Sequence, residues 1–269
     1  MSTMASLFGP PGLEIVDAQV FTSSGPWVKP ATALPTDVVV VDLWGGGASG
    51  MMHATDGSGL GGAGAGHYRA CFLASALSAT ETVVVGAGGE PVSVAGAGKA
   101  GGVSSFKTAQ AGGGVSTSDG GNGGGIFAPT TSSHGGGPGG AHPGQHEGAG
   151  RWGGGATAST SSPSTSQAEH GGAACYKSSK AARCSVWGGA AGGAHSATTN
   201  AGTTDGGISI HGGNGGDGAT GSGAATAGSV PGGGGGGSKV GPSGAGARGE
   251  VRVYVLRGVT QDIGDLVLA

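Results

Sequence analysis

Glycine is the feature that most constrains the fold of this chain, because 68 of its 269 residues are glycine. That share is about a quarter, whereas average proteins contain roughly 7% glycine. Leu, Ile, Val and Phe together supply only about 16% of the residues, which is too little apolar side chain to offset the conformational entropy that so many glycines lose on folding. The sequence therefore excludes an ordinary single-core domain. It leaves a flexible chain, or a fold whose backbone packs through its own hydrogen bonds.

Charge and targeting features exclude several classes of function. Charged residues make up only 10% of the chain and the formal net charge is −3, so repulsion does not hold the chain open. The 12 Lys and Arg residues form no basic stripe, which predicts no nucleic-acid partner. The N-terminal residues lack the pattern of a signal peptide, and no apolar run approaches the roughly 20 residues of a membrane span. We expect a protein that is made in the cytoplasm and does not insert into a membrane.

Strand patterns lie towards the two ends of the sequence. Apolar and polar residues alternate over 14–21, and the Ser/Gly/Pro turn that follows is typical of a hairpin. The strongest strand prediction is 37–44, a β-branched run that ends in three glycines. Further strands are predicted over 67–73, 81–85, 103–106 and 250–257. No window has a sustained 3.6-residue period, so the predicted fold class is mainly β and irregular, with almost no α-helix.

Blocks of glycine, separated by polar stretches, fill the middle of the chain. Between residues 212 and 221 glycine recurs at every third position. A period of three belongs to the extended left-handed helix with three residues per turn, and collagen would need a longer register and more proline. Polyglycine II helices of this kind can pack closely and exchange backbone hydrogen bonds, whereas the alternative is a disordered Gly/Ser linker. A Ser-x-aromatic sequence enters a glycine block at 104–106 and again at 185–187, which favours the ordered bundle.

We divide the chain into five segments on this basis. A β-rich scaffold (20–107) precedes a glycine-rich polyglycine II region with loop insertions (108–249), and a closing strand (250–257) follows. Residues 1–19 cannot form a core alone, so we predict that they attach the protein to an assembly. Residues 258–269 form a C-terminal tail. The predicted architecture is a small β-sheet scaffold that holds a packed bundle of polyglycine II helices.

Side chains beside the glycine blocks are predicted to have structural roles. Trp44, Phe106 and Trp187 should cap the glycine-rich core. Cys175 and Cys184 could close a small loop through a disulfide in an oxidising medium, and two reduced thiols are the alternative because no secretion signal is present.

Catalytic and metal-binding patterns are missing from the sequence. The histidines of the central insertions lack the spacing of a preorganised site, so we predict no metal and no cofactor. A Gly-x-Gly-x-x-Gly match that begins at Gly96 is expected by chance in a chain so rich in glycine. Neither a nucleophile elbow nor a pair of carboxylates for sugar cleavage is present. We predict that the protein is not an enzyme.

The ordered set of motifs resembles a known family. The segments FTSSGPWVKP, a Val-rich strand that ends in WGGG, GGAGAGHYRACFLASAL, VVVGAGG, GGVSSF and, after the glycine blocks, GARGEVRVYV occur in that order. Over roughly residues 20–256 they resemble the glycine-rich domain of bacteriophage tail-fibre and tail-tip proteins. The block 128–183, with its Ser/Thr/His-rich insertions, departs from the family pattern and leaves the number of helices open.

The resemblance implies a virion tail protein whose packed polyglycine II helices display loops that bind the host receptor. Several copies per particle would act by non-covalent adhesion. The implied partners are other tail proteins, bound through the N-terminal segment, and a bacterial surface receptor that is a glycan or an outer-membrane protein. The alternative is a purely structural tail or fibre component without receptor contact. A glycine-rich ice-binding or wall protein is disfavoured, because regular flat faces and a signal peptide are missing.

Receptor contacts are expected from aromatic and basic side chains in the non-glycine insertions, because such side chains contribute most at binding hot spots. The residues that we select on this ground are Phe127, Trp152, Tyr176, Lys177, Lys180 and Arg183. For Phe127 and Trp152, capping of the glycine core is an equal alternative.

Overall fold

The fold is built from antiparallel β-strands. A computed structural model describes residues 13–53, 59–117, 120–122, 169–170, 182, 184–195 and 204–258. The strands are β1 (Leu13–Phe21), β2 (Gly25–Val28), β3 (Val38–Trp44), β4 (His67–Leu73), β5 (Thr80–Val84), β6 (Ser104–Phe106), β7 (Ala109–Ala111), β8 (Val115–Thr117), β9 (Gly120–Asn122) and β10 (Glu250–Gly258). One 3₁₀ turn (Ala74–Ala76) and no α-helix occur in these ranges. The predicted mainly-β class is therefore confirmed.

Two four-stranded sheets form a sandwich. Their strand orders are β1-β10-β3-β4 and β2-β5-β6-β7. Alternate residues of β3 and β10 face inward, where Val39, Val41 and Val253 are fully buried. They share a core with Trp27 and Phe106 of the second sheet, whose rings meet edge to face at 5.6 Å. This core is small, as the low apolar content of the sequence requires.

The predicted hairpin after residue 21 does not form. β1 pairs with β10 in one sheet, whereas β2 pairs with β5 in the other. The chain crosses between the sheets because Trp27 is buried between them. Ser24 secures the crossing, since its Oγ accepts the N–H of Val85 at 2.9 Å. The chain does turn at these residues as predicted, but the turn forms a corner of the sandwich.

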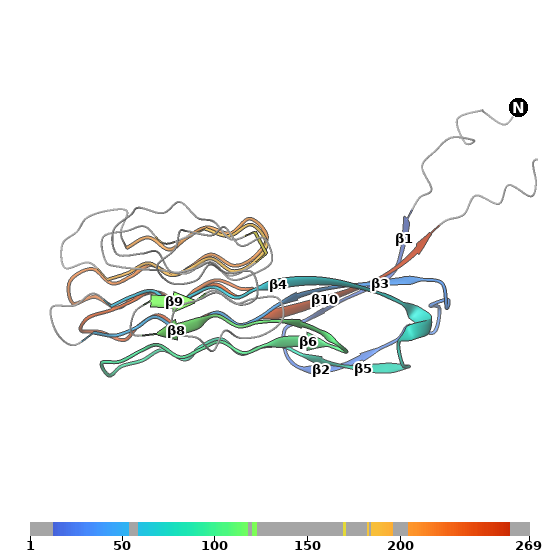
Figure 1. Cartoon of the computed structure of the whole chain (residues 1–269), viewed down its shortest axis with the longest axis horizontal. Coiled ribbons are helices and arrows are strands. Elements are labelled where there is room, and N and C mark those ends of the chain that lie inside the picture. The colour runs from blue at the N-terminus through green and yellow to red at the C-terminus, as the bar shows by residue number, and fades with distance from the viewer. Residues whose placement is uncertain are drawn as a thin grey trace, which may run out of the picture.

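The strands continue directly into glycine segments. β3 runs into 45–53 and 59–66 returns to β4, while 86–92 and 96–102 connect β5 to β6 in the same way. The segment 242–249 leads into β10. Figure 1 shows the resulting glycine bundle at one end of the sandwich, with the start of β1 and the end of β10 at the opposite end.

Backbone hydrogen bonds hold the bundle together with a repeat of three residues. In the run 45–53, every third N–H group donates to the same neighbouring segment. The set that begins at Gly45 donates to carbonyls of 59–66, and the set that begins one residue later donates to carbonyls of 96–102. The set that begins two residues later donates to carbonyls of 242–249, except for its last member, His53. Three further segments donate N–H groups to carbonyls of the same run, through Gly89, Gly114 and Gly235. This is the periodicity of a helix with three residues per turn. The polyglycine II conformation itself stays a prediction.

Close approach of neighbouring backbones explains why these positions are glycine. A Cβ atom added at Gly46 would lie 1.9 Å from the carbonyl oxygen of Ala87, and one added at Gly236 would lie 1.9 Å from that of Asp217. Such distances are far below van der Waals contact. The backbones can pack this closely only because no side chain stands between them.

Polar side chains complete the hydrogen bonding at one edge of the bundle. Asn214 accepts the N–H of Ser209 at 2.8 Å, and Asp217 accepts the N–H of Gly206 at 2.8 Å. Asn214 and Asp217 are exposed and three residues apart, while Gly213 and Gly216 are buried. The side chains thus take the place of a further glycine segment as hydrogen-bond acceptors.

Candidate functional site

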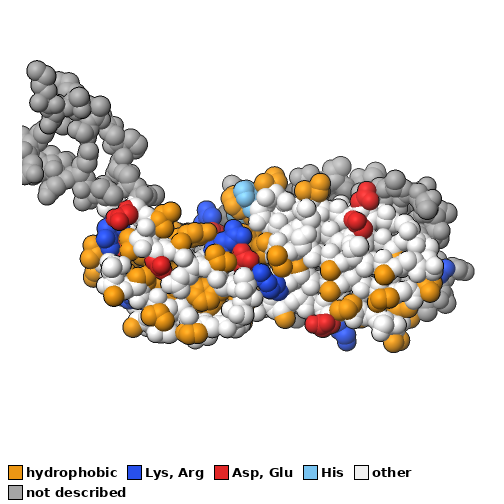
Figure 2. Space-filling view, turned by 180° about the vertical axis from the view of Figure 1, so that it is seen from behind, with side chains coloured by type: hydrophobic (Ala, Val, Ile, Leu, Met, Phe, Trp, Pro, Cys, Tyr) orange, Lys and Arg blue, Asp and Glu red, His pale blue; other side chains and the backbone are white. Residues whose placement is uncertain are grey.

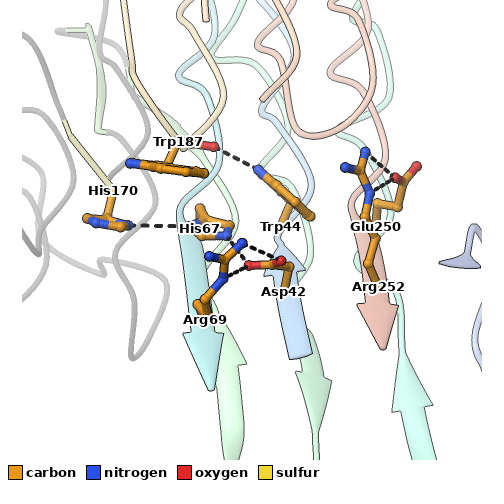
Figure 3. A network of polar contacts seen from close by, with 8 residues as sticks. All are labelled: Asp42, Trp44, His67, Arg69, His170, Trp187, Glu250 and Arg252. Atoms are coloured by element: carbon orange, nitrogen blue, oxygen red, sulfur yellow. Dashed lines mark hydrogen bonds and ion pairs between the residues drawn. The ribbon is translucent and has the colours of Figure 1, made fainter. Parts of the chain in front are cut away.

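Polar and aromatic side chains gather where the first sheet passes into the glycine bundle. We call the eight side chains drawn in Figure 3 the junction network: Asp42, Trp44, His67, Arg69, His170, Trp187, Glu250 and Arg252. In the register of the sheet Trp44 lies between His67 and Glu250, and Asp42 lies between Arg69 and Arg252. Because side chains two residues apart share a face of a strand, all six lie on the outer face of the sheet.

Asp42 is the buried anion of the network. Arg69 donates to both of its carboxylate oxygens, at 2.7 and 2.8 Å, and Nε2 of His67 lies 3.0 Å from Oδ1. Burial alone would raise the pKa of Asp42, but the hydrogen bonds from His67 and Arg69 outweigh it and the pKa lies below its ordinary value. The hydrogen bond to Asp42 likewise raises the pKa of Arg69. The carboxylate therefore stays ionised and acts as a fixed acceptor.

Two tryptophans connect the sheet to the bundle. Nε1 of Trp44 donates to the carbonyl oxygen of Trp187 at 2.7 Å. The guanidinium of Arg252 lies 4.7 Å from the ring centroid of Trp44 and pairs with Glu250 at 2.8 Å, so the indole is covered by a cation that is itself neutralised. The ring of Trp187 stacks on His211, with centroids 3.9 Å apart.

His67 connects the network to the segment 169–170. Its backbone N–H donates to the carbonyl of His170 at 2.8 Å, and the N–H of Trp187 donates to the carbonyl of Glu169 at 2.8 Å. The two imidazole Nδ1 atoms of His67 and His170 lie 3.3 Å apart. The His67 ring is 1% exposed and lies 4.6 Å from the ring of Trp44.

These contacts make the junction network a structural connection between the sheet and the glycine bundle. In the described part of the chain no three His, Cys, Asp or Glu side chains are grouped so that they could hold a metal ion. The described hydrogen-bond partners of the His67 ring are Asp42 and His170, so no Ser or Cys nucleophile is bonded to it. Asp42 is 5% exposed and Arg69 is 51% exposed. The charge that the network offers to solvent is therefore positive, and Figure 2 shows Lys and Arg side chains near this junction.

The three predicted aromatic caps lie in two different places in the structure. Trp44 and Trp187 lie at the junction, bonded to each other beside glycine segments. Phe106 lies in the sandwich core, against Trp27 and Phe72.

The predicted receptor-binding residues lie outside the described residues. They are Phe127, Trp152, Tyr176, Lys177, Lys180 and Arg183. Cys175 lies outside them as well, so the predicted disulfide stays a prediction. Cys184 has a free thiol in the structure, and its Sγ accepts the backbone N–H of Ile208, with N and Sγ 3.4 Å apart.

Turns form the end of the bundle that lies away from the sandwich. The run 86–92 leaves the second sheet and the run 96–102 returns to it, so the turn between them lies at the far end of the bundle (Figure 1). Val94, in this turn, is 76% exposed. Such turns can carry exposed side chains without disturbing the packed glycines.

Sequence reasoning missed most of the junction network. Asp42 interrupts an apolar run, and Arg69 and Arg252 occupy outward positions of their strands, so alternation alone could have placed these three on one face. No local signal joins His67 to His170, which lies 103 residues away.

Comparison with known proteins places the chain by its sequence. A family model described as a glycine-rich domain matches residues 22–256. The match begins just before β2 and ends within β10, so it covers most of the sandwich and the glycine bundle. No curated protein matches the chain significantly. Within the described ranges, no helix has the length and apolar character needed to cross a membrane.

Proposed function

The chain belongs to the glycine-rich domain family, and from this premise we propose that it is a bacteriophage tail-fibre or tail-tip protein. In this proposal it resides in the virion tail and attaches the particle to the host surface by non-covalent adhesion. It carries out no chemical reaction and needs no cofactor. A purely structural role in the tail, without receptor contact, is the second candidate.

One observation carries the proposal: the chain enters and leaves the described fold at the same end. β1 begins at Leu13 and β10 ends at Gly258, and these two residues are paired. They lie at the end of the sandwich away from the glycine bundle (Figure 1). A protein of this shape can be held by one end while the turns of the bundle project from the other, as an adhesin requires.

An apolar row on the sandwich favours attachment to other tail proteins at that end. Ile15, Leu256, Val38 and Leu73 lie side by side across all four strands of the first sheet, on its outer face. Ile15 is 64% exposed and Leu73 is 54% exposed. Exposed apolar side chains that adjoin one another are typical of protein-protein contact sites.

The glycine bundle is suited to displaying loops rigidly. Its backbone is hydrogen-bonded to neighbours in several directions, and a segment held at its ends by a rigid support loses less entropy on binding than a free one. We place the receptor contacts in the insertions, where aromatic and basic side chains occur together. Several copies on one particle would multiply weak single contacts with a surface glycan or an outer-membrane protein.

Competition for the host surface tests this function. Purified full-length chain is added in excess to host cells before the phage that encodes it, and unadsorbed phage is counted, with an unrelated protein of similar net charge as the control. The proposal predicts that adsorption falls only with the glycine-rich chain. If purified particles contain the chain and adsorption is unchanged, the structural role replaces the adhesin. If the particles lack the chain, both candidates are wrong.

A further inference from the structure

Two histidines far apart in the sequence face each other at the junction. The Nδ1 atoms of His67 and His170 lie 3.3 Å apart, their ring centroids lie 5.6 Å apart, and the ring planes differ by 18°. The centroid separation exceeds the nitrogen separation by about two ring radii. Both nitrogens therefore lie close to the line that joins the rings, which is the alignment of an N–H···N hydrogen bond.

A shared metal ion fits this geometry poorly. Such an ion lies about 2.0–2.1 Å from each imidazole nitrogen and along its lone pair. With both lone pairs of His67 and His170 directed at the opposite nitrogen, an ion at that distance would have to sit off the line. The described residues also group no third ligand with this pair. The contact therefore has the geometry of two imidazoles that share one proton.

Asp42 determines which protons the pair can hold. An ionised carboxylate only accepts hydrogen bonds, so Nε2 of His67 carries a hydrogen and donates to Asp42. Neutral His67 then offers a lone pair at Nδ1, and Nδ1–H of His170 donates to it. A first added proton, at Nε2 of His170, leaves this bond in place and strengthens it. A second one must go to Nδ1 of His67, where it meets the hydrogen of the opposite ring.

We propose that His67 and His170 form an acid-released latch. The latch holds the segment 169–170 against the junction while the pair carries at most one positive charge, and it opens when the pair carries two. Opening breaks the imidazole contact and the two backbone hydrogen bonds that His170 and Glu169 accept from His67 and Trp187. Because only the second added proton disrupts the contact, the latch is closed at neutral pH and opens as the pH falls. This inference does not depend on the proposed function.

The surroundings of the pair bias the equilibrium in both directions. Among the residues that the structure describes, the titratable and charged groups on the elements packed against it are Asp42, Arg69, Glu169, His211, Glu250 and Arg252. Asp42 is a negative charge bonded directly to His67. Arg69 lies beside the same carboxylate and opposes the accumulation of a second positive charge. Glu250 and Arg252 pair with each other, so their joint influence on the pair is small.

Amide hydrogen exchange measures the latch directly. The N–H groups of His67 and Trp187 both donate to the segment 169–170, whereas the nearby N–H of Gly45 donates to Gly66 and that of Gly189 to Ala65. After correction for the intrinsic pH dependence of exchange, protection at His67 and Trp187 should fall by about tenfold or more between about pH 7.5 and about pH 5. Protection at Gly45 and Gly189 should stay within about twofold over the same range.

A non-titrating variant supplies the decisive comparison. In His170→Asn the amide can donate to, or accept from, Nδ1 of His67 in either protonation state, so the acid-induced loss of protection should disappear. His211→Asn, which changes an exposed histidine stacked on Trp187, should retain the full response. The proposal is overturned if wild-type protection at His67 and Trp187 does not change with pH. It is also overturned if His170→Asn responds to acid as the wild type does.

Discussion

At the residue scale, a single carboxylate, Asp42, holds two side chains of the neighbouring strand in place at the junction. It accepts hydrogen bonds from His67 and Arg69 on the neighbouring strand while remaining almost fully buried. A buried carboxylate is tolerated only when its oxygens are bonded in this way. The charge therefore fixes the positions of the imidazole and the guanidinium that face the glycine bundle.

Replacing Asp42 should weaken the fold at neutral pH. Asp42→Asn removes the charge-assisted bonds, and the free energy of unfolding at pH 7 should fall by about 2–3 kcal/mol. Because the pKa of Asp42 is lowered in the folded state, its stabilising contribution is present above the ordinary carboxyl pKa of about 3.9. It is lost as the pH falls through the lower folded value. Urea unfolding at pH 7 and at about pH 2.5 should show the difference from wild type shrinking in acid.

A matched control separates this effect from a general loss of negative charge. Asp205 is exposed, so Asp205→Asn should change the stability by less than about 0.5 kcal/mol at either pH. A difference for Asp42→Asn that stays constant down to about pH 2.5 would show that the carboxylate charge is not what stabilises the junction.

The aromatic and basic residues predicted to bind the receptor carry a second prediction at this scale. We expect Tyr176→Ala, and the joint change of Lys177, Lys180 and Arg183 to Ser, to weaken adsorption of the protein to host cells by about tenfold, with the charge variant affected more at low salt. Cell-binding assays at two ionic strengths measure this, and thermal melting checks that each variant is folded. If the folded variants adsorb as well as wild type, the receptor contact lies elsewhere, with Trp152 as the next candidate.

Glycine segments, more than strands, set the architecture at the scale of elements. The run 45–53 bonds to its neighbours with a three-residue repeat, so each residue faces a different neighbour from the one before. The backbone of a neighbouring segment therefore lies close to each glycine of such a run, on the side that this glycine faces. Side-chain packing, which stabilises most folds, contributes mainly in the sandwich.

Gly215→Val tests this confinement. A Cβ at Gly215 would lie 1.8 Å from the carbonyl oxygen of Ala191, so the neighbouring segments must separate and lose their mutual hydrogen bonds. We expect a loss of about 3 kcal/mol or more, seen as a Tm lowered by roughly 6–12 °C or as failure to express in soluble form. At Gly258 an added Cβ meets no atom within 4 Å, so Gly258→Val should leave the Tm nearly unchanged. Equal Tm values for the two variants would contradict close packing in the bundle.

Local patterns predicted most of the strands, because alternation and β-branched runs are properties of short segments. The ranges 37–44 and 67–73 match β3 and β4 closely. The corner between β1 and β2 was taken for a hairpin, since a turn sequence does not say in which sheet the next strand lies. Residues 13–19 belong to β1, so of the predicted attachment segment only 1–12 lies outside the described fold.

The site was much less predictable than the strands, for a physical reason. The junction network depends on contacts between distant segments, such as His67 with His170 and Trp44 with Trp187. Nothing in the neighbouring residues of His170 distinguishes it from the other histidines of the insertions. Its partner is determined by the packing of the glycine bundle, which only the folded chain reveals.

At the scale of the whole molecule, the sandwich and the bundle have different sources of order. Apolar side chains stabilise the first, and lateral backbone hydrogen bonds stabilise the second. Figure 2 shows the bundle half as a surface made mainly of backbone and small polar side chains, with scattered apolar ones. The strands β3, β4 and β10 are continuous with glycine segments of the bundle, so the ordered sheet provides fixed starting points for those segments. The proposed function needs this order, because loops on a flexible linker would not be held in place.

Amide hydrogen exchange of the glycine segments tests that order most directly. We predict that the N–H groups of 45–52 and 234–237, bonded to neighbouring segments in the fold, exchange at least about a hundredfold more slowly than in an unstructured chain. Their protection should approach that of β3 in the same protein. Glycine amides that exchange at unstructured rates, beside a protected β3, would contradict the account and leave a flexible glycine linker attached to a small β-sandwich.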